Sequence, residues 1–295
     1  MSCHAEFLRV AADSAALAGA VRDDHRHAGL PDGEVALLDF VETVTLAPFT
    51  VGAAHWAGLR AHGWSDAEIA RAALGSAHFN YLNRVADGVG IRLDFAASGH
   101  LTPPSAPPRS APPRFAAPGA PAAFLARGAG AHAAGADAAA GLASDEAPEL
   151  VSAIAFLPAV ARLVRDWRRY HLAGTPALPD ALRARIALYC AALANCEPSA
   201  RWARLRAERL GVDGAVLDAL AAGAADDSDE GGRERAVLDH ARRLTLEPAA
   251  AREEHVAALR TLGLDDRDVL QLTMLVAYLS FEHRAVLALG AGGRD

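Results

Sequence analysis

The sequence predicts an all-α protein made of duplicated helical domains with a Pro/Ala/Gly-rich linker between them. Alanine and aliphatic residues dominate the 295 positions, and the β-branched alternation typical of strands is scarce. The segment 34–90 also matches the segment 234–290 without a gap. Every helix and turn of the two segments therefore has the same length, as expected for a tandem duplication of one structural unit.

The two copies share residues that begin or end helices as well as apolar residues. The identical pairs include Glu34/Glu234, Leu38/Leu238, Asp39/Asp239, Thr45/Thr245, Leu46/Leu246, Pro48/Pro248, His55/His255, Leu59/Leu259, Arg60/Arg260, Gly63/Gly263, Asp66/Asp266, Arg84/Arg284 and Gly90/Gly290.

Composition argues against several classes of function. The net charge of −7, with no basic cluster, argues against a nucleic-acid partner. No apolar run reaches the roughly 18–20 residues that span a bilayer, so no membrane partner is expected. The start, Met1 to His4, has neither a basic nor an apolar signal region, and three cysteines cannot form a disulfide framework. These features predict a cytoplasmic protein.

In chain order, residues 5–29 carry apolar side chains at helical spacing, and Pro31-Asp32-Gly33 breaks the chain. The repeat then opens with a helix whose shared apolar positions, 37/237, 38/238, 41/241 and 44/244, mark one buried face. A shorter helix carries His55 or His255 and ends before Gly63 or Gly263. Serine or aspartate at 65/265 caps a long helix that runs to about 87/287.

Between the copies, residues 96–146 are rich in proline, glycine and alanine and are expected to form a disordered linker. Residues 223–232 are a second, shorter candidate for disorder. The second unit adds predicted helices at 150–172, at 181–195 and from Cys196 to about 211. The domains are therefore placed at 1–95 and 147–295.

Five segments resemble the carboxymuconolactone decarboxylase superfamily, and in particular its AhpD-like, peroxidase-related branch of alkylhydroperoxidases. They are LRAHGWSDAEI at 59–69 with HFNYLNRVADG at 78–88, their counterparts LRTLG at 259–263 and YLSFEHR at 278–284, and RIALYCAALANC at 185–196. The resemblance covers nearly all of the chain except the linker. It implies the AhpD-like helical fold, association into homo-oligomers, and antioxidant activity as a thiol-dependent oxidoreductase that reduces small hydroperoxides with a thiol reductant protein. No cofactor is implied.

In active members of that family the corresponding helix ends in Cys-x-x-Cys-x-x-x-His, with a glutamate about twelve residues earlier. A helix N-terminus lowers the pKa of the attacking thiol, and the histidine and glutamate relay its proton. In this chain the resemblance places Cys196 at the first cysteine, Ser199 at the second, Ala203 at the histidine and Ala184 at the glutamate. Only one of the four groups is present.

The resemblance places His4 at the family's histidine in the first copy, next to Cys3. The first unit therefore looks truncated. The catalytic candidates are Cys196, His4 and Cys3. The alternative for Cys196 is an inactive relic of the family site. The alternative for His4 and Cys3 is a frayed N-terminus without a function. Glu197 would oppose a thiolate at Cys196. Cys190 is expected in the core, since its thiol points away from Cys196.

The remaining polar candidates line a pocket or form a buried network. His55 and His255 could line the pocket or lie on a surface. On one helix, His78, Asn80, Asn83 and Arg84 are expected to form a buried polar network that tethers Glu34 or Asp39. In the second copy the counterparts are His283 and Arg284. Ser199 is expected to lie at the pocket. His25 and His27 beside Asp23 and Asp24 have the content of a metal site, but a solvated helix end is preferred and no metal is expected.

Three functions are compatible with these residues. The first is a thiol-dependent, alkylhydroperoxidase-like enzyme that uses Cys196. The second is a non-catalytic oligomeric or regulatory member that partners an intact paralogue. The third is a cofactor-free enzyme like the lactone decarboxylases, which needs no thiol.

Overall fold

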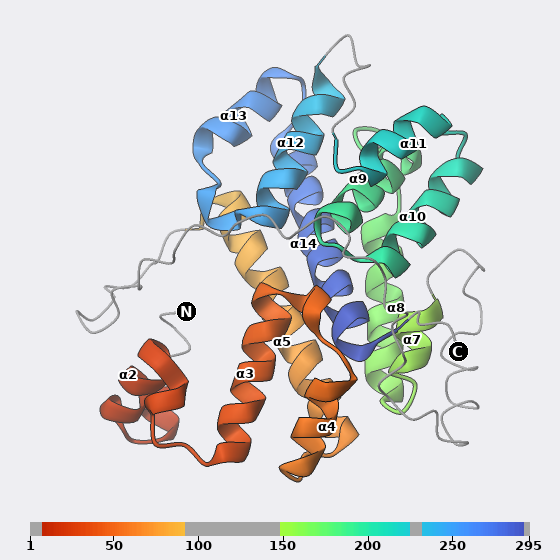
Figure 1. The fold of residues 1–295 in the computed structure, drawn as a ribbon. Helices are drawn as coiled ribbons and strands as arrows, with labels where there is room; N and C mark the ends of the chain where they lie inside the picture. The colour runs from red at the N-terminus through yellow and green to blue at the C-terminus, as the bar shows by residue number, and fades with distance from the viewer. Residues whose placement is uncertain (1–7, 92–147, 225–231, 292–295) are drawn as a thin grey trace.

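A computed structural model of the chain describes residues 8–91, 148–224 and 232–291, and these ranges contain helices and turns but no strand (Figure 1). The all-α class predicted from the sequence is confirmed. The predicted linker at 96–146 and most of the segment 223–232 lie outside the described residues.

The first half holds α2 and the 3-10 helix η1, followed by the helices of the first repeat. The bounds are α2 (Ala15–Asp24), η1 (His25–His27), α3 (Asp32–Leu46), η2 (Pro48–Thr50), α4 (Ala53–Ala61) and α5 (Asp66–Val89). In the second half they are α7 (Pro148–Ala153), α8 (Pro158–Leu172), α9 (Asp180–Leu193), α10 (Glu197–Arg209), α11 (Gly214–Ala221), α12 (Arg233–Leu246), η3 (Pro248–Ala250), α13 (Glu253–Thr261) and α14 (Asp266–Leu289).

The two matching segments form the same elements. The bounds of η3, α13 and α14 equal those of η2, α4 and α5 shifted by 200 residues. Ser65 and Asp265 each accept the backbone N–H three residues ahead, which completes the predicted N-caps. Gly63 and Gly263 have φ values of 89° and 85°, the left-handed conformation that ends the preceding helix at low cost.

The long helices α5 and α14 pack along each other at the centre of the molecule (Figure 1). Gly88 makes this approach possible, because a Cβ at that position would lie 2.5 Å from Cγ2 of Thr273. The arginines of the two helices reach across reciprocally. Arg84 donates to the carbonyl of Thr245 at 3.4 Å, and Arg284 donates to the carbonyl of Thr45 at 2.9 Å. The two halves are thus related by a pseudo-two-fold arrangement, as in an isologous dimer interface.

The hydrophobic core extends across both halves. One cluster joins α3, α4 and α5 to α7, α8 and the C-terminal part of α14. A second cluster joins α9, α10, α11 and α12 to the N-terminal part of α14. The residues of 1–95 and 147–295 that the structure describes therefore share a core, with α14 in both clusters.

Helix α14 is the one described helix that is long and apolar enough to cross a membrane by composition. Its most apolar stretch is 89% buried inside the molecule. This burial is typical of a core helix, and α14 is accounted for by its packing on α5, α9 and α12.

Two predicted helices are broken, and one helix was missed. The helix expected over 150–172 is interrupted at 154–157, because Pro158 has no N–H to donate and starts a new helix, α8. The helix expected over 5–29 is broken at Asp13, whose φ is 47°, and Ser14 caps α2. Helix α11, capped by Asp213, was not predicted.

Candidate functional site

Cys196 lies at the junction of α9 and α10, where the resemblance placed a catalytic thiol. Asn195 adopts a left-handed conformation with φ 54°, which turns the chain sharply between the two helices. Cys196 is the N-cap residue of α10, and its carbonyl accepts the N–H of Ala200 at 2.9 Å. The predicted start of this helix is confirmed. The thiol thus stands at a helix N-terminus, a position that favours a thiolate.

Burial opposes that effect at Cys196. Its side chain has no solvent exposure, and its Sγ donates to Oγ of Ser199 at 3.3 Å. Burial raises the pKa of the Cys196 thiol to about 11; the contact with Ser199 lowers it and the nearby Glu197 adds to the rise. The thiol is therefore protonated and out of contact with solvent at neutral pH.

The other positions of the family motif hold no ionisable group. Ser199, Ala203 and Ala184 are all buried. Ser199 is the hydrogen-bond partner of Cys196, and the two alanines pack in the core formed by α9, α10 and α12. At these positions the chain provides neither a second thiol nor a proton relay.

Cys190 is a core residue, as expected. It is 1% exposed, and it accepts a hydrogen bond from Oγ1 of Thr245 at 3.4 Å. Burial raises the pKa of this thiol to about 12. Both described cysteines are free thiols. The other two catalytic candidates, Cys3 and His4, lie outside the described residues.

The repeated histidines cap their own helices. Nδ1 of His55 accepts the N–H of Gly52 at 3.1 Å, and Nδ1 of His255 accepts the N–H of Arg252 at 3.0 Å. Each histidine is the third residue of its helix, and its side chain bonds to the backbone of the N-cap residue that precedes the helix. This local role accounts for their recurrence at the same position.

The predicted network on α5 forms with different members. Arg84 donates to the carbonyl and to Oδ1 of Asn80, both at 3.1 Å, and Asn80 donates to Oγ1 of Thr45 at 3.2 Å. His78 and Asn83 are exposed and take no part in these bonds.

The expected tether to Glu34 or Asp39 is wrong. Asp39 instead pairs with His25 and Arg26, and the carboxylate of Glu34 has no ion-pair partner among the described residues. The helical spacing correctly predicted that Arg84 lies on the buried face of α5. His78 and Asn83 lie on the neighbouring, exposed face.

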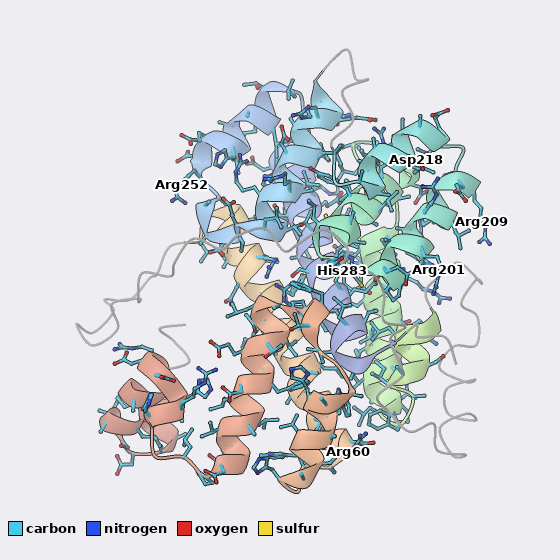
Figure 2. The ribbon with its side chains drawn as sticks, in the orientation of Figure 1. Arg60, Arg201, Arg209, Asp218, Arg252 and His283 are labelled. Carbon is cyan, nitrogen blue, oxygen red and sulfur yellow. The ribbon has the colours of Figure 1, made fainter. Side chains whose placement is uncertain are left out.

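In the second copy the corresponding network is smaller. Arg284 donates to Oγ of Ser280 at 2.6 Å. His283 lies in the interior on α14 (Figure 2) and is 1% exposed. Neither of its ring nitrogens has a hydrogen-bond partner among the described residues. Burial and the nearby arginines, Arg284 first, lower the pKa of His283 to about 3, so the ring is neutral.

A buried ionic group on α8 and α14 was not anticipated from the sequence. Arg168 pairs with Glu282, and the hydroxyl of Tyr278 donates to the same carboxylate at 2.9 Å. The guanidinium of Arg168 also stacks over the ring of Trp202, 3.9 Å from its centroid.

His171 lies beside this group, with its ring stacked on that of Tyr278 at 5.0 Å between centroids. Burial lowers the pKa of His171 to about 4, and it raises that of Tyr278 to about 12. Glu282, a charged residue inside the largely apolar helix α14, is the sequence signal for this group, but its partner Arg168 lies 114 residues earlier in the chain.

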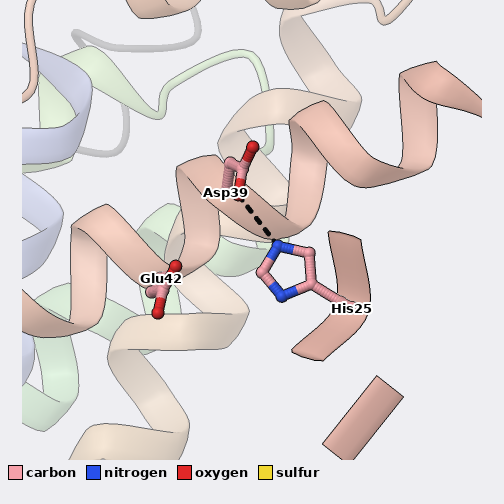
Figure 3. A group of neighbouring side chains, drawn as sticks. All are labelled: His25, Asp39 and Glu42. Atoms are coloured by element: carbon pink, nitrogen blue, oxygen red, sulfur yellow. Dashed lines mark hydrogen bonds and ion pairs between the residues drawn. The ribbon is translucent and has the colours of Figure 1, made fainter. Parts of the chain in front are cut away.

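The histidine cluster near the first helix end forms ion pairs. His25 Nε2 lies 2.9 Å from Oδ1 of Asp39, with Glu42 one turn farther along α3 (Figure 3). These three side chains bring ligand atoms within 4.8 Å of one another. However, the guanidinium of Arg26 lies 2.5 Å from Asp39 and 2.6 Å from Glu42 and already supplies the positive charge. His27 pairs with Asp24. A structural ion-pair cluster accounts for these residues.

Comparison with known proteins identifies no relative, because no family model, no curated protein and no solved structure matches the chain.

Proposed function

We propose that the chain is a non-catalytic member of the AhpD-like branch of the carboxymuconolactone decarboxylase superfamily. It carries two tandem copies of the unit and acts as an oligomeric or regulatory partner of an intact paralogue. The protein keeps the helical scaffold and performs no thiol chemistry. Its free buried thiols are compatible with a cytoplasmic location.

The state of Cys196 carries this proposal. A peroxidatic cysteine attacks as its thiolate and must meet the peroxide. The Cys196 side chain is fully buried, its S–H is committed to Ser199, and its pKa is raised to about 11. At neutral pH these conditions leave a negligible fraction of thiolate and no access for a substrate.

The roles of the repeated residues support the same conclusion. His55 and His255 cap helices, Arg60 and Arg260 each pair with the aspartate six residues ahead at 2.7 Å, and Arg84 and Arg284 join the halves. These three shared pairs are therefore explained by maintenance of the fold.

Thiol-dependent reduction of small hydroperoxides is the second candidate, and the place of Cys196 at the N-cap of α10 favours it. In that reaction the Cys196 thiolate takes the distal peroxide oxygen to give a sulfenic acid, and the alcohol leaves. An external dithiol then reduces the sulfenic acid to thiol and water and is itself oxidised to a disulfide. The loop around Asn195 would have to open for this step.

Turnover of an organic hydroperoxide with a dithiol decides between the two candidates. We expect the full chain and its Cys196→Ser variant to consume hydroperoxide at the same background rate. The matched controls are Cys190→Ser, which alters the other buried thiol, and Cys3→Ser. Turnover that disappears in Cys196→Ser and persists in Cys190→Ser would establish the thiol enzyme and refute the non-catalytic proposal.

A further inference from the structure

A group of polar side chains is enclosed in the second half of the molecule, on α8, α10 and α14. The members of this enclosed polar group are Arg168 and His171 of α8, Trp202 of α10, and Tyr278, Glu282 and His283 of α14. None of these residues is more than 6% exposed. The ion pair, the hydroxyl bond and the ring contacts described above join the others, and His283 directly follows Glu282 on α14.

The first copy of the repeat does not enclose the same positions. On α5 the counterparts of Tyr278, Glu282 and His283 are all exposed. In the second half, α8, α9 and α10 pack on α14. Well-packed apolar side chains in place of a buried ion pair are often at least as stable, so stability alone does not explain why this group is polar.

The charges of the enclosed polar group are matched within it. The guanidinium of Arg168 pairs with the carboxylate of Glu282, which also accepts the hydroxyl of Tyr278. The two imidazoles carry no charge at pH 7, because burial lowers the pKa of His171 to about 4 and that of His283 to about 3. An ionic ligand would add an unmatched charge to this interior, at a high cost in solvation.

The hydrogen bonds of the same group are incomplete. Nε1 of Trp202, Nε2 of His171 and both ring nitrogens of His283 have no hydrogen-bond partner among the described residues. An indole N–H can only donate, and a neutral imidazole offers one donor and one acceptor. Buried polar atoms of folded proteins are almost always bonded, and each one left without a partner costs stability.

Aromatic rings surround these polar atoms. The rings of Trp167 and Phe281 pack on that of Tyr278, with centroids 5.2 and 6.0 Å away. The ring of Trp202 lies under the guanidinium of Arg168. A few polar atoms among aromatic walls are typical of small-molecule sites.

We propose that the enclosed polar group is a binding site for a small uncharged molecule that carries a carbonyl oxygen and an N–H or O–H group. The carbonyl oxygen accepts the indole N–H of Trp202, whose ring Arg168 holds in place. The N–H or O–H group of the ligand donates to the unprotonated ring nitrogen of His283. Such a ligand completes hydrogen bonds and leaves the matched charges as they are. The site does not depend on thiol chemistry and is compatible with a catalytic or a non-catalytic chain.

Formamide is the probe, because it is among the smallest molecules with both an accepting carbonyl and a donating N–H. Nuclear magnetic resonance of the 15N-labelled full chain follows the indole N–H of Trp202 and the ring nitrogens of His283. We expect both signals to shift saturably with a common Kd of about 1 mM or weaker, the limit for a ligand of this size. The indole of Trp64 already donates to the carbonyl of Gly33 at 2.8 Å, so its signal should not move. Formate, which is of similar size but charged, should bind at least tenfold more weakly.

Two conservative variants test whether both side chains belong to one site. Trp202→Phe keeps an aromatic ring beside Arg168 and removes the N–H, and His283→Leu removes the imidazole. Each variant should weaken formamide binding at least tenfold, read from the signal of the residue that remains. His62→Gln, at an exposed position, is the matched control and should leave the Kd unchanged. Circular dichroism confirms that each variant is folded.

Three results would overturn the proposal. The first is the absence of a saturable shift at Trp202 and His283, or a shift of the Trp64 signal by the same amount. The second is a Kd that Trp202→Phe and His283→Leu leave unchanged. The third is binding of formate as tight as that of formamide, which would show that the site selects a charged ligand.

Discussion

The side chains of Cys196 and His283 both end in groups that titrate, and both lie where water does not reach. In such surroundings the neutral form of each group is favoured, which raises the thiol pKa and lowers the imidazole pKa. Glu282 is equally buried but is matched with Arg168 and the hydroxyl of Tyr278. The charge of Glu282 is balanced by its partners, whereas Cys196 and His283 avoid a buried charge by staying in their neutral forms.

His283 provides a direct test, because its ring nitrogens lack partners among the described residues. His283→Leu removes no hydrogen bond and replaces two buried polar atoms with apolar ones of similar volume. We expect the variant to be at least as stable as the natural chain at pH 7, measured by urea unfolding. A loss above about 2 kcal/mol would show that the imidazole makes a bond that the structure lacks.

The buried pair of Arg168 and Glu282 should respond to single and double changes in opposite ways. Glu282→Leu alone leaves the guanidinium of Arg168 buried without its carboxylate and should cost about 3–5 kcal/mol of stability. Adding Arg168→Met should recover most of that loss. The exposed pair of Arg204 and Glu208 is the control, where Glu208→Ala should cost less than about 1 kcal/mol. Equal effects at both pairs would contradict the burial of the first.

At the scale of single elements, local signals predicted the helices well. Short local motifs mark the helix ends, and the structure follows them. They are the capping pair Ser65 and Glu68, the glycine Gly63, and the prolines Pro48 and Pro248. Pro158 was an equally visible signal for the break before α8, and the periodicity of the apolar residues around it concealed that break. His55 and His255 recur visibly in the sequence, but their capping role depends on the positions of backbone N–H groups, which the sequence pattern does not give.

Gly88 tests the packing of α5 on α14. An added Cβ would lie 2.5 Å from Cγ2 of Thr273 and 3.2 Å from the methyl groups of Leu244. Gly88→Ala should therefore destabilise the chain by about 1–3 kcal/mol, despite the gain in helix propensity. Thr273→Ser removes the closest methyl group and should offset part of this loss in the double variant. Gly58→Ala, where a Cβ meets no atom within 4 Å, is the control. A stable Gly88→Ala would contradict the close approach of the two helices.

At the scale of the whole molecule, the two halves are held together by contacts between residues far apart in the sequence. Arg84 and Arg284 each reach the carbonyl of the threonine one residue before the end of α12 or α3 in the opposite half. The sequence showed that both arginines and both threonines recur, but a single chain offers no signal that the contacts cross between copies. The same limit applies to Arg168 and Glu282. Local patterns specify the helices, and the partners of the buried polar groups follow only from the packing.

Acid should destabilise the whole molecule through its buried histidines. The pKa of His171 and of His240 is lowered to about 4, and that of His283 to about 3, each by burial first. Below the unfolded pKa of about 6.5 the unfolded chain binds protons that the folded chain does not, so stability falls as pH drops.

We expect a loss of about 1.4 kcal/mol per pH unit from each of these groups between pH 6.5 and its folded pKa, measured by urea unfolding at several pH values. His283→Leu should flatten that profile, whereas a change at the exposed His62, His62→Gln, should leave it unaltered. A profile that does not change between pH 7 and pH 5 would contradict the burial of these rings.

The central claim is that Cys196 is a buried, protonated thiol and therefore no nucleophile. Its most direct test is the rate of alkylation by iodoacetamide as a function of pH, followed by mass spectrometry in a Cys3→Ser, Cys190→Ser background. We expect Cys196 to stay unmodified at pH 7–8 while the chain is folded, with reactivity that rises only toward its pKa of about 11 or upon unfolding. Rapid modification of the folded chain with a midpoint near neutral pH would contradict the account.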